Sequence, residues 1–166
     1  MSVDGRNFDD LFERLADRVH GGLKGQLRLS ASLRQLREAA LAQSAGGCLV
    51  LDVGAGLGQV ALQLAVDGHR VTALDISARM VAHIETQAQH QGVAIHCLHG
   101  SIQSHHSGLV RDGAGFDLVC CHAALEWMTD PQQAIGLMST LLSPRGALSL
   151  LFYNNAALVH RNLIRG

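Results

Sequence analysis

The chain has 166 residues, of which 48% are hydrophobic and 16% are charged, and its formal net charge is −1. This composition is typical of one globular domain with a substantial core and excludes a disordered chain. The balanced charge also gives no sign of the strongly basic surface that many nucleic-acid-binding proteins carry.

All four cysteines stand in apolar runs and none belongs to a CxxC pair: Cys48, Cys97, Cys120 and Cys121. This pattern is typical of buried, reduced thiols, so we expect a cytoplasmic protein without disulfides. The ten histidines lack metal-ligand spacing, and we expect no metal site. The first residues lack the apolar segment of a signal peptide, and no apolar run reaches the ~20 residues of a membrane span. We therefore expect a soluble protein with no membrane partner.

The N-terminal part of the sequence predicts two helices. Residues 8–20 place apolar side chains on one helical face, and a second helical pattern runs over about residues 23–43. A Gly-Gly pair follows each pattern and ends it. We therefore predict an N-terminal helical cap over residues 1–45.

From residue 46 onward, apolar runs of strand length alternate with helical patterns. Strands are predicted over residues 48–53, 70–75, 93–98, 116–121 and 147–153. Helices are predicted over residues 58–67, 78–91 and 131–142, with Ser77 and Asp130 as N-caps and Gly92 as a C-cap. A turn-rich segment with Gly108 and a polar His105-His106 loop is predicted before the fourth strand, and a turn at 144–146 before the fifth.

Strands that alternate with helices are typical of βαβ units. The sequence therefore predicts an α/β core over residues 46–166, a doubly wound, mostly parallel sheet of the Rossmann-like class. The last residues begin another helical pattern that stops at Gly166, so we expect this core to be truncated at its C-terminus.

The turn between the first strand and the next helix is rich in glycine. Gly54, Gly56 and Gly58 follow Asp52. Glycine permits a sharp turn and a close ligand approach, and the next helix points free N–H groups at that ligand. Asp75 ends the second strand about twenty residues later, where a carboxylate can bind both hydroxyls of a ribose. The pattern predicts a nucleotide-type cofactor site, with a plain tight turn as the alternative.

The spacing of the glycines distinguishes between cofactors. A dinucleotide site has the pattern G-x-G-x-x-G, whereas Gln59 stands where the third glycine would fall. Residues 52–58, D-x-G-x-G-x-G, instead resemble motif I of the class I S-adenosylmethionine (SAM)-dependent methyltransferases. This resemblance implies SAM as the cofactor, with the turn holding its methionine part and Asp75 its ribose.

Further segments make the resemblance more specific: 6–28 with KGQLR, 52–80, 121–131 (CHAALEWMTDP) and 146–166 with SLLFYN. Together they resemble the tRNA 5-carboxymethoxyuridine methyltransferases over essentially the whole chain. The resemblance implies that SAM methylates the carboxylate of 5-carboxymethoxyuridine at the wobble position of tRNA, giving the methyl ester. It implies tRNA as the partner and indicates nothing about the oligomeric state.

The resemblance also implies cofactor contacts at positions spread along the chain. Arg28 would contact the SAM carboxylate, and His122 would close the methionine end. The other implied cofactor-binding residues are Asp52, Gly54, Ala55 and Gly56 at the turn, Asp75 at the ribose, and Ser101 and Ile102 beside the adenine.

The implied reaction needs little acid–base chemistry. A carboxylate acceptor is already ionised at neutral pH, so transfer depends on alignment and on exclusion of water. The sequence contains no G-x-S-x-G nucleophile elbow, and we expect no general base. Trp127, Tyr153 and Asn154 are predicted to orient the substrate, with core packing of Trp127 and strand termination by Asn154 as the alternatives.

Three other functions stay open. The near-neutral charge favours a methyltransferase for a small carboxylic acid or other metabolite, because tRNA phosphates need basic partners. The abrupt end of the sequence favours a SAM-binding module or fragment without turnover. A nicotinamide-dependent dehydrogenase is the third, and the glycine spacing counts against it.

Overall fold

The computed structural model describes residues 23–38, 47–110 and 115–152. The elements are, in chain order, α2 (Leu23–Leu36), β1 (Leu49–Val53), α3 (Gln59–Val66), β2 (Arg70–Asp75), α4 (Ala78–Gln91), β3 (Ile95–His99), α5 (Ile102–Leu109), β4 (Phe116–His122), the 3-10 helix η4 (Leu125–Trp127), α6 (Pro131–Thr140) and β5 (Leu142–Leu151). The predicted helix over residues 8–20 lies outside the described residues, as does the chain after residue 152.

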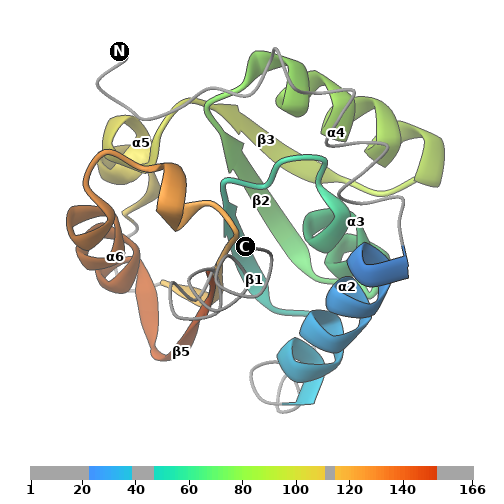
Figure 1. Ribbon diagram of the computed structural model, residues 1–166, viewed down its shortest axis with the longest axis horizontal. Helices are drawn as coiled ribbons and strands as arrows, with labels where there is room; N and C mark the ends of the chain where they lie inside the picture. Colours follow the sequence, from blue (N-terminus) through green and yellow to red (C-terminus); the bar gives the residue numbers. More distant parts are fainter. Residues whose placement is uncertain (1–22, 39–46, 111–114, 153–166) are drawn as a thin grey trace, which may run out of the picture.

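The five strands form one parallel sheet with the order β3-β2-β1-β4-β5 (Figure 1). β1 lies at the centre and pairs with β2 on one side and β4 on the other. The direction of winding therefore reverses at β1, which makes its carboxyl end the topological switch point of the sheet. The predicted doubly wound α/β fold is confirmed, and all described strands are parallel.

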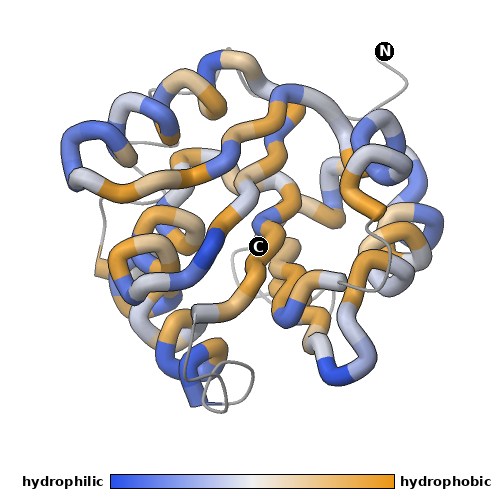
Figure 2. Tube along the Cα trace, turned by 180° about the vertical axis from the view of Figure 1, so that it is seen from behind, coloured by the Kyte–Doolittle hydropathy of each residue, from blue (hydrophilic) through white to orange (hydrophobic). Residues whose placement is uncertain are grey.

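Helices cover both faces of this sheet (Figure 1). α2, α3 and α4 contribute to one core cluster, which includes Leu64 and Leu118, and α5 and α6 contribute to a second, which includes Phe116 and Met138. The central strands are buried on both faces, as expected for a parallel sheet between helices. Figure 2 shows the same arrangement, with hydrophobic strands inside and hydrophilic segments on the outer helices.

The helix ends confirm the predicted capping residues. The Ser77 hydroxyl accepts a hydrogen bond from the Met80 N–H at 3.0 Å and begins α4. The Asp130 carboxylate accepts one from the Gln133 N–H at 2.9 Å and begins α6. Gly92 ends α4 with a φ of 67°, a left-handed conformation that glycine adopts without a steric penalty.

The segment before β4 differs from the prediction. Residues 102–109 form α5, so His105 and His106 lie on a helix and the predicted polar loop is wrong. A reciprocal capping box between Ser101 and Ser104 begins the helix, and its first and last residues are buried in the second core cluster. Capping and burial together outweigh the poor helix propensity of this sequence.

The start of β5 also differs from the prediction. β5 begins at Leu142 and includes Pro144 and Gly146, so the predicted turn at 144–146 is wrong. The pairing with β4 is irregular between Phe116 and Leu118, where the register shifts. β5 is the outermost described strand on this side, and an edge position tolerates a proline that lacks an N–H donor.

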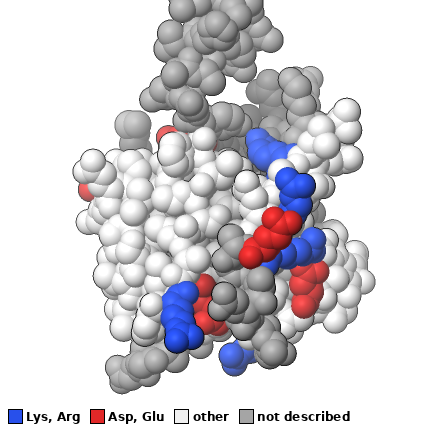
Figure 3. Space-filling model, turned by 90° about the horizontal axis from the view of Figure 1, so that it is seen from below, with Lys and Arg blue, Asp and Glu red and all other residues white. Residues whose placement is uncertain are grey.

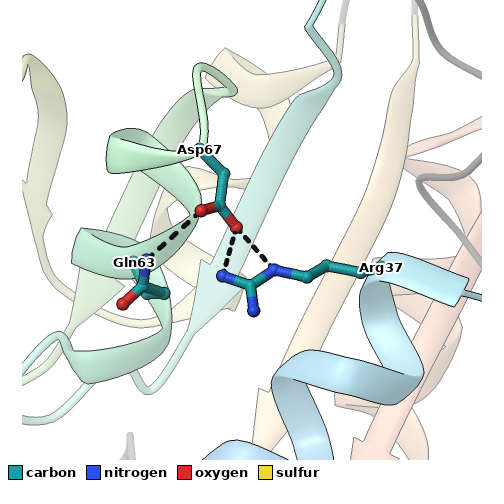
Figure 4. Close-up of polar contacts among 3 residues, drawn as sticks. All are labelled: Arg37, Gln63 and Asp67. Atoms are coloured by element: carbon teal, nitrogen blue, oxygen red, sulfur yellow. Dashed lines mark hydrogen bonds and ion pairs between the residues drawn. The ribbon is translucent and has the colours of Figure 1, made fainter.

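The C-terminal half of α2 fixes this helix to the domain. Leu33 and Leu36 are buried in the same core cluster as residues of β1 and α3. Just after the helix, Nε of Arg37 donates to Oδ2 of Asp67 at 2.8 Å, and Nη2 lies 2.6 Å from the same oxygen (Figure 4). The Gln63 amide donates to Oδ1 of Asp67 at 3.2 Å. This partly exposed ion pair contributes little free energy, but it ties α2 to the end of α3.

Asp52 is a buried acidic residue near the carboxyl end of β1, with 3% of its surface exposed. Burial, and then the negative charge of Asp75, raise the pKa of its carboxyl group from 3.8 to about 7, although a hydrogen bond from the Ala61 backbone acts in the opposite direction. Burial, and then the charge of Asp52, also raise the pKa of the thiols of Cys120 and Cys121 on β4.

We predict that Asp52→Asn removes a pH dependence of folding stability. Because the folded pKa of about 7 lies above the unfolded value of 3.8, the folded state keeps a proton on Asp52 that the unfolded chain loses. The stabilisation is complete below about pH 4 and is lost as the pH rises through about 7, a change of about 4 kcal/mol. Asparagine can accept the same backbone hydrogen bond and does not ionise.

Urea unfolding of wild type and variant across about pH 4 to 8 measures this effect. The free energy of unfolding of Asp52→Asn, relative to wild type, should rise with pH. The exposed Glu85→Gln on α4 removes one carboxylate elsewhere and serves as the control. A difference between Asp52→Asn and wild type that stays constant over the whole range would contradict the prediction.

Candidate functional site

A cleft of about 330 Å³ opens at the carboxyl ends of β1, β2 and β4. Its walls come from α2, from the glycine turn after β1, from the end of β2, from the start of α5 and from the segment between β4 and η4. The cleft lies at the switch point, where doubly wound sheets bind their ligands, and its volume is in the range of small-molecule sites.

The cofactor-binding residues predicted from the sequence all line this one cleft: Arg28, Asp52, Gly54, Ala55, Gly56, Asp75, Ser101, Ile102 and His122. They come from separate segments of the chain, and only the fold brings them together. Trp127 also lines the cleft and is 43% exposed, so it forms a wall and not part of the core. Tyr153 and Asn154 lie outside the described residues. The individual contacts with a cofactor stay predictions.

The glycine turn is held against the end of β2. The N–H groups of Gly54 and Ala55 both donate to the Leu74 carbonyl, at 2.8 and 3.1 Å. Gly54, Gly56 and Gly58 have φ values of 69°, 56° and 73°, in the left-handed region that other residues rarely adopt. The backbone conformation therefore favours glycine at all three positions.

The space beside the three glycines differs. A Cβ atom at Gly54 would lie 2.5 Å from the Cβ of Ala124, and one at Gly58 would lie 2.6 Å from Cγ1 of Ile84. A Cβ atom at Gly56 would meet nothing within 4 Å. Gly54 and Gly58 thus allow the protein to pack against itself, whereas Gly56 leaves open space at the cleft wall for a ligand.

Asp75 holds the turn in place from the end of β2. Its Oδ2 accepts a hydrogen bond from the Gly56 N–H at 2.8 Å, and its Oδ1 accepts one from the Ser77 N–H at 2.9 Å. The residue is 9% exposed and lines the cleft. Each carboxylate oxygen has more than one lone pair, so the group can also accept hydrogen bonds from ligand hydroxyls.

His122 ends β4 and is half-buried at the cleft wall. Its Nε2 lies 2.9 Å from the Ser149 hydroxyl on β5, and burial lowers the pKa of the imidazole, which favours the neutral ring at pH 7. The next residue, Ala123, has a φ of 56°, unusual for a residue other than glycine. The sequence analysis missed Ser149, although it is a polar residue within an apolar strand.

The sequence analysis also missed most of the contribution of α2. Gly25, Leu29 and Ser32 line the cleft together with Arg28. Arg28 is the one Lys or Arg among the described residues of the cleft wall. An anionic group of a ligand would therefore be attracted to the α2 side of the cleft, opposite the acidic groups at the ends of β1 and β2.

One face of the molecule carries mixed charge. Seen from below, Lys and Arg side chains lie among Asp and Glu side chains, with no extended patch of one sign among the described residues of this face (Figure 3). Within residues 23–38, 47–110 and 115–152, no three His, Cys, Asp or Glu residues gather as a metal site, and no helix there is long and apolar enough to cross a membrane.

Two curated relatives match most of the chain. It is 36% identical over 99% of its length to a protein of Escherichia coli (strain K12) named tRNA 5-carboxymethoxyuridine methyltransferase, of which it covers 62%. It is 32% identical over 81% of its length to the ubiquinone biosynthesis O-methyltransferase of Pectobacterium carotovorum, of which it covers 56%. The chain thus spans less than two thirds of the length of either relative.

Solved structures share the fold. The magnesium protoporphyrin IX methyltransferase of Synechocystis PCC 6803, crystallised with bound SAH, aligns with a TM-score of 0.67 over 96% of this chain and 75% of its own. The sequences are 21% identical, so the likeness concerns the fold.

The family model described as "Methyltransferase domain" matches residues 51–150, which run from β1 into β5 and include the glycine turn and the ends of β2 and β4. Methyltransferases of the same fold have been solved with SAH, the demethylated form of SAM. The chain therefore belongs to the SAM-dependent methyltransferase family.

Proposed function

We propose that the protein methylates the carboxylate of 5-carboxymethoxyuridine at the wobble position of tRNA, with SAM as the methyl donor. The observation that carries the proposal is the similarity to the E. coli tRNA enzyme, which extends over 99% of the chain, whereas the similarity to the ubiquinone enzyme extends over 81%. Such an enzyme would act in the cytoplasm, where its tRNA substrate is found.

The cleft fits SAM in both shape and charge. The open space beside Gly56 admits a ligand against the turn, and Asp75 has lone pairs for two ribose hydroxyls. Arg28 would pair with the carboxylate of the methionine part, while Ser101 and Ile102 at the start of α5 would flank the adenine. SAM supplies a methyl group on a positively charged sulfonium, which a carboxylate acceptor can attack directly.

The residues around the acceptor would act by orientation. The carboxylate acceptor is ionised at neutral pH, so the chain needs no group that removes a proton. Burial lowers the pKa of His122 and so favours the neutral ring, which would not hold the acceptor in an ion pair that slows its attack. The exposed ring of Trp127 offers a flat surface on which the uracil base can stack. Tyr153 and Asn154 remain predicted substrate-orienting residues.

We predict that Asp75→Asn weakens SAM binding by about 10- to 100-fold, because it removes charge-assisted hydrogen bonds to the ribose. Isothermal titration calorimetry with SAM measures the affinity. Glu85→Gln, which removes an exposed carboxylate from α4, should bind SAM like wild type. An unchanged affinity in a folded Asp75→Asn protein would refute the ribose assignment.

The glycine turn gives a paired prediction. Gly56→Ala should weaken SAM binding at least tenfold while lowering stability by only about 1 kcal/mol, because its side chain would enter the open space of the cleft. Gly58→Ala should instead lower the melting temperature strongly, because its Cβ would collide with Ile84. Calorimetry with SAM and thermal unfolding should be measured for both variants. Equal losses of SAM affinity and equal losses of melting temperature in Gly56→Ala and Gly58→Ala would contradict the prediction.

A methyltransferase for a small carboxylic acid or other metabolite is the second candidate. The mixed charge of the face in Figure 3 favours it, because tRNA binding depends on neutralising phosphates. The similarity to a ubiquinone biosynthesis enzyme also favours it. A SAM-binding piece without turnover is the third candidate, since the chain spans 62% of the tRNA-modifying relative.

The decisive experiment incubates the protein with SAM and tRNA that carries 5-carboxymethoxyuridine. Nuclease digestion and mass spectrometry should then find a wobble nucleoside heavier by one methyl group. The Asp75→Asn variant is the negative control. Binding of SAM without methylation of tRNA would reject the proposed substrate, and a parallel assay with small carboxylic acids would separate the second candidate from the third.

A further inference from the structure

Ser149 and His122 form a polar pair between neighbouring strands. Ser149 on β5 lies beside Cys120 on β4 in the strand register, and His122 lies one full side-chain repeat further along β4. Leu118 and Cys120 belong to the core cluster beneath α2 and α3, so this alternation places His122 on the same face of the sheet. The distance between Nε2 of His122 and Oγ of Ser149 is 2.9 Å.

This pairing leaves one ring nitrogen of His122 for a ligand. His122 lines the cleft, and Nδ1 has no hydrogen-bond partner among the described residues. Because Nε2 is engaged by Ser149, Nδ1 is the nitrogen that can interact with a molecule in the cleft. Burial lowers the pKa of the ring and so favours its neutral form, in which one nitrogen bears a proton and the other a lone pair.

The charge of the ligand decides which nitrogen bears the proton. The methionine end of SAM carries a cationic sulfonium and a cationic ammonium group, while its carboxylate would pair with Arg28 on the α2 side of the cleft. A lone pair facing these groups attracts them, whereas an N–H dipole facing them repels them. Nδ1 should therefore be unprotonated, and the Nε2 proton should point at an acceptor. The Ser149 hydroxyl is an acceptor in the correct place.

We propose that Ser149 is a positioning residue, which accepts a hydrogen bond from Nε2–H of His122 and thereby presents the Nδ1 lone pair to the cationic methionine end of SAM. The inference rests on the proposed function and on the placement of His122 at the methionine end of SAM, which the resemblance to the tRNA methyltransferases implies. It concerns cofactor binding and is independent of the identity of the acceptor.

Three serine variants test the proposal. Ser149→Ala removes the acceptor and should weaken SAM binding about three- to tenfold, the effect of one hydrogen bond. Ser149→Thr keeps the hydroxyl and should bind like wild type, because it offers His122 the same acceptor. Ser139→Ala, on the exposed side of α6, should also bind like wild type.

Nitrogen NMR of the imidazole supplies a measurement that a merely structural role would not change. Two-bond proton–nitrogen spectra of the full chain with SAM bound distinguish the two tautomers, and His122→Ala identifies the signals of this ring among the ten histidines. Wild type and Ser149→Thr should show a proton on Nε2 and none on Nδ1. Ser149→Ala should show a mixture of both tautomers.

Several outcomes would overturn the proposal. One is a proton on Nδ1 in wild type, which needs no variant to fold. Another is a Ser149→Ala protein with wild-type SAM affinity and an unchanged tautomer. If His122→Ala binds SAM with wild-type affinity, His122 does not contact the methionine end of SAM, and the inference fails. Failure to methylate tRNA, with the Ser149 effects intact, would reject the proposed substrate and leave this inference standing.

Discussion

The hydrogen bonds from Gly56 and Ser77 to the Asp75 carboxylate are the interaction on which the cleft depends. They join the loop after β1 to the loop after β2, the two loops that flank the switch point. Asp75 is buried, so its charge must be satisfied by these donors. Burial, and then this charge, raise the pKa of Asp52 on the neighbouring strand. One carboxylate thus fixes the backbone of the turn, contributes to the raised pKa of Asp52 and lines the cleft.

The glycine turn shows that one motif can combine two physical requirements. Gly54 and Gly58 lack side chains because the protein itself occupies the space, at Ala124 and at Ile84. Gly56 lacks one where the protein leaves the space open. Gly54 and Gly58 therefore let the turn pack closely against the segment after β4 and against α4. Ligand binding beside Gly56 depends on this packing, because the packing holds the turn in place.

Patterns that are local in sequence could be predicted, and those set by tertiary packing could not. The buried strands, the caps Ser77 and Asp130, and the switch point all follow from apolar periodicity and turn chemistry. α5 was missed because its stability comes from a serine capping box and two buried end residues. The pair of Ser149 and His122 was missed for a related reason, since it exists only through the register of β4 and β5.

Different parts of the cleft would bind the cofactor and select the acceptor. The floor, made by the turn and the ends of β1 and β2, provides an open glycine, an acidic residue and a tight turn, which are the features proposed to hold SAM. The mouth is formed by α2 and η4, which bring Arg28 and the exposed Trp127 to the same opening. Arg28 would pair there with the carboxylate of SAM, and the exposed ring of Trp127 would stack on the planar base of the proposed acceptor. α2 is anchored at its far end, through Leu33, Leu36 and the ion pair of Arg37, so its cleft-lining half is held in place without contacts that would fill the mouth.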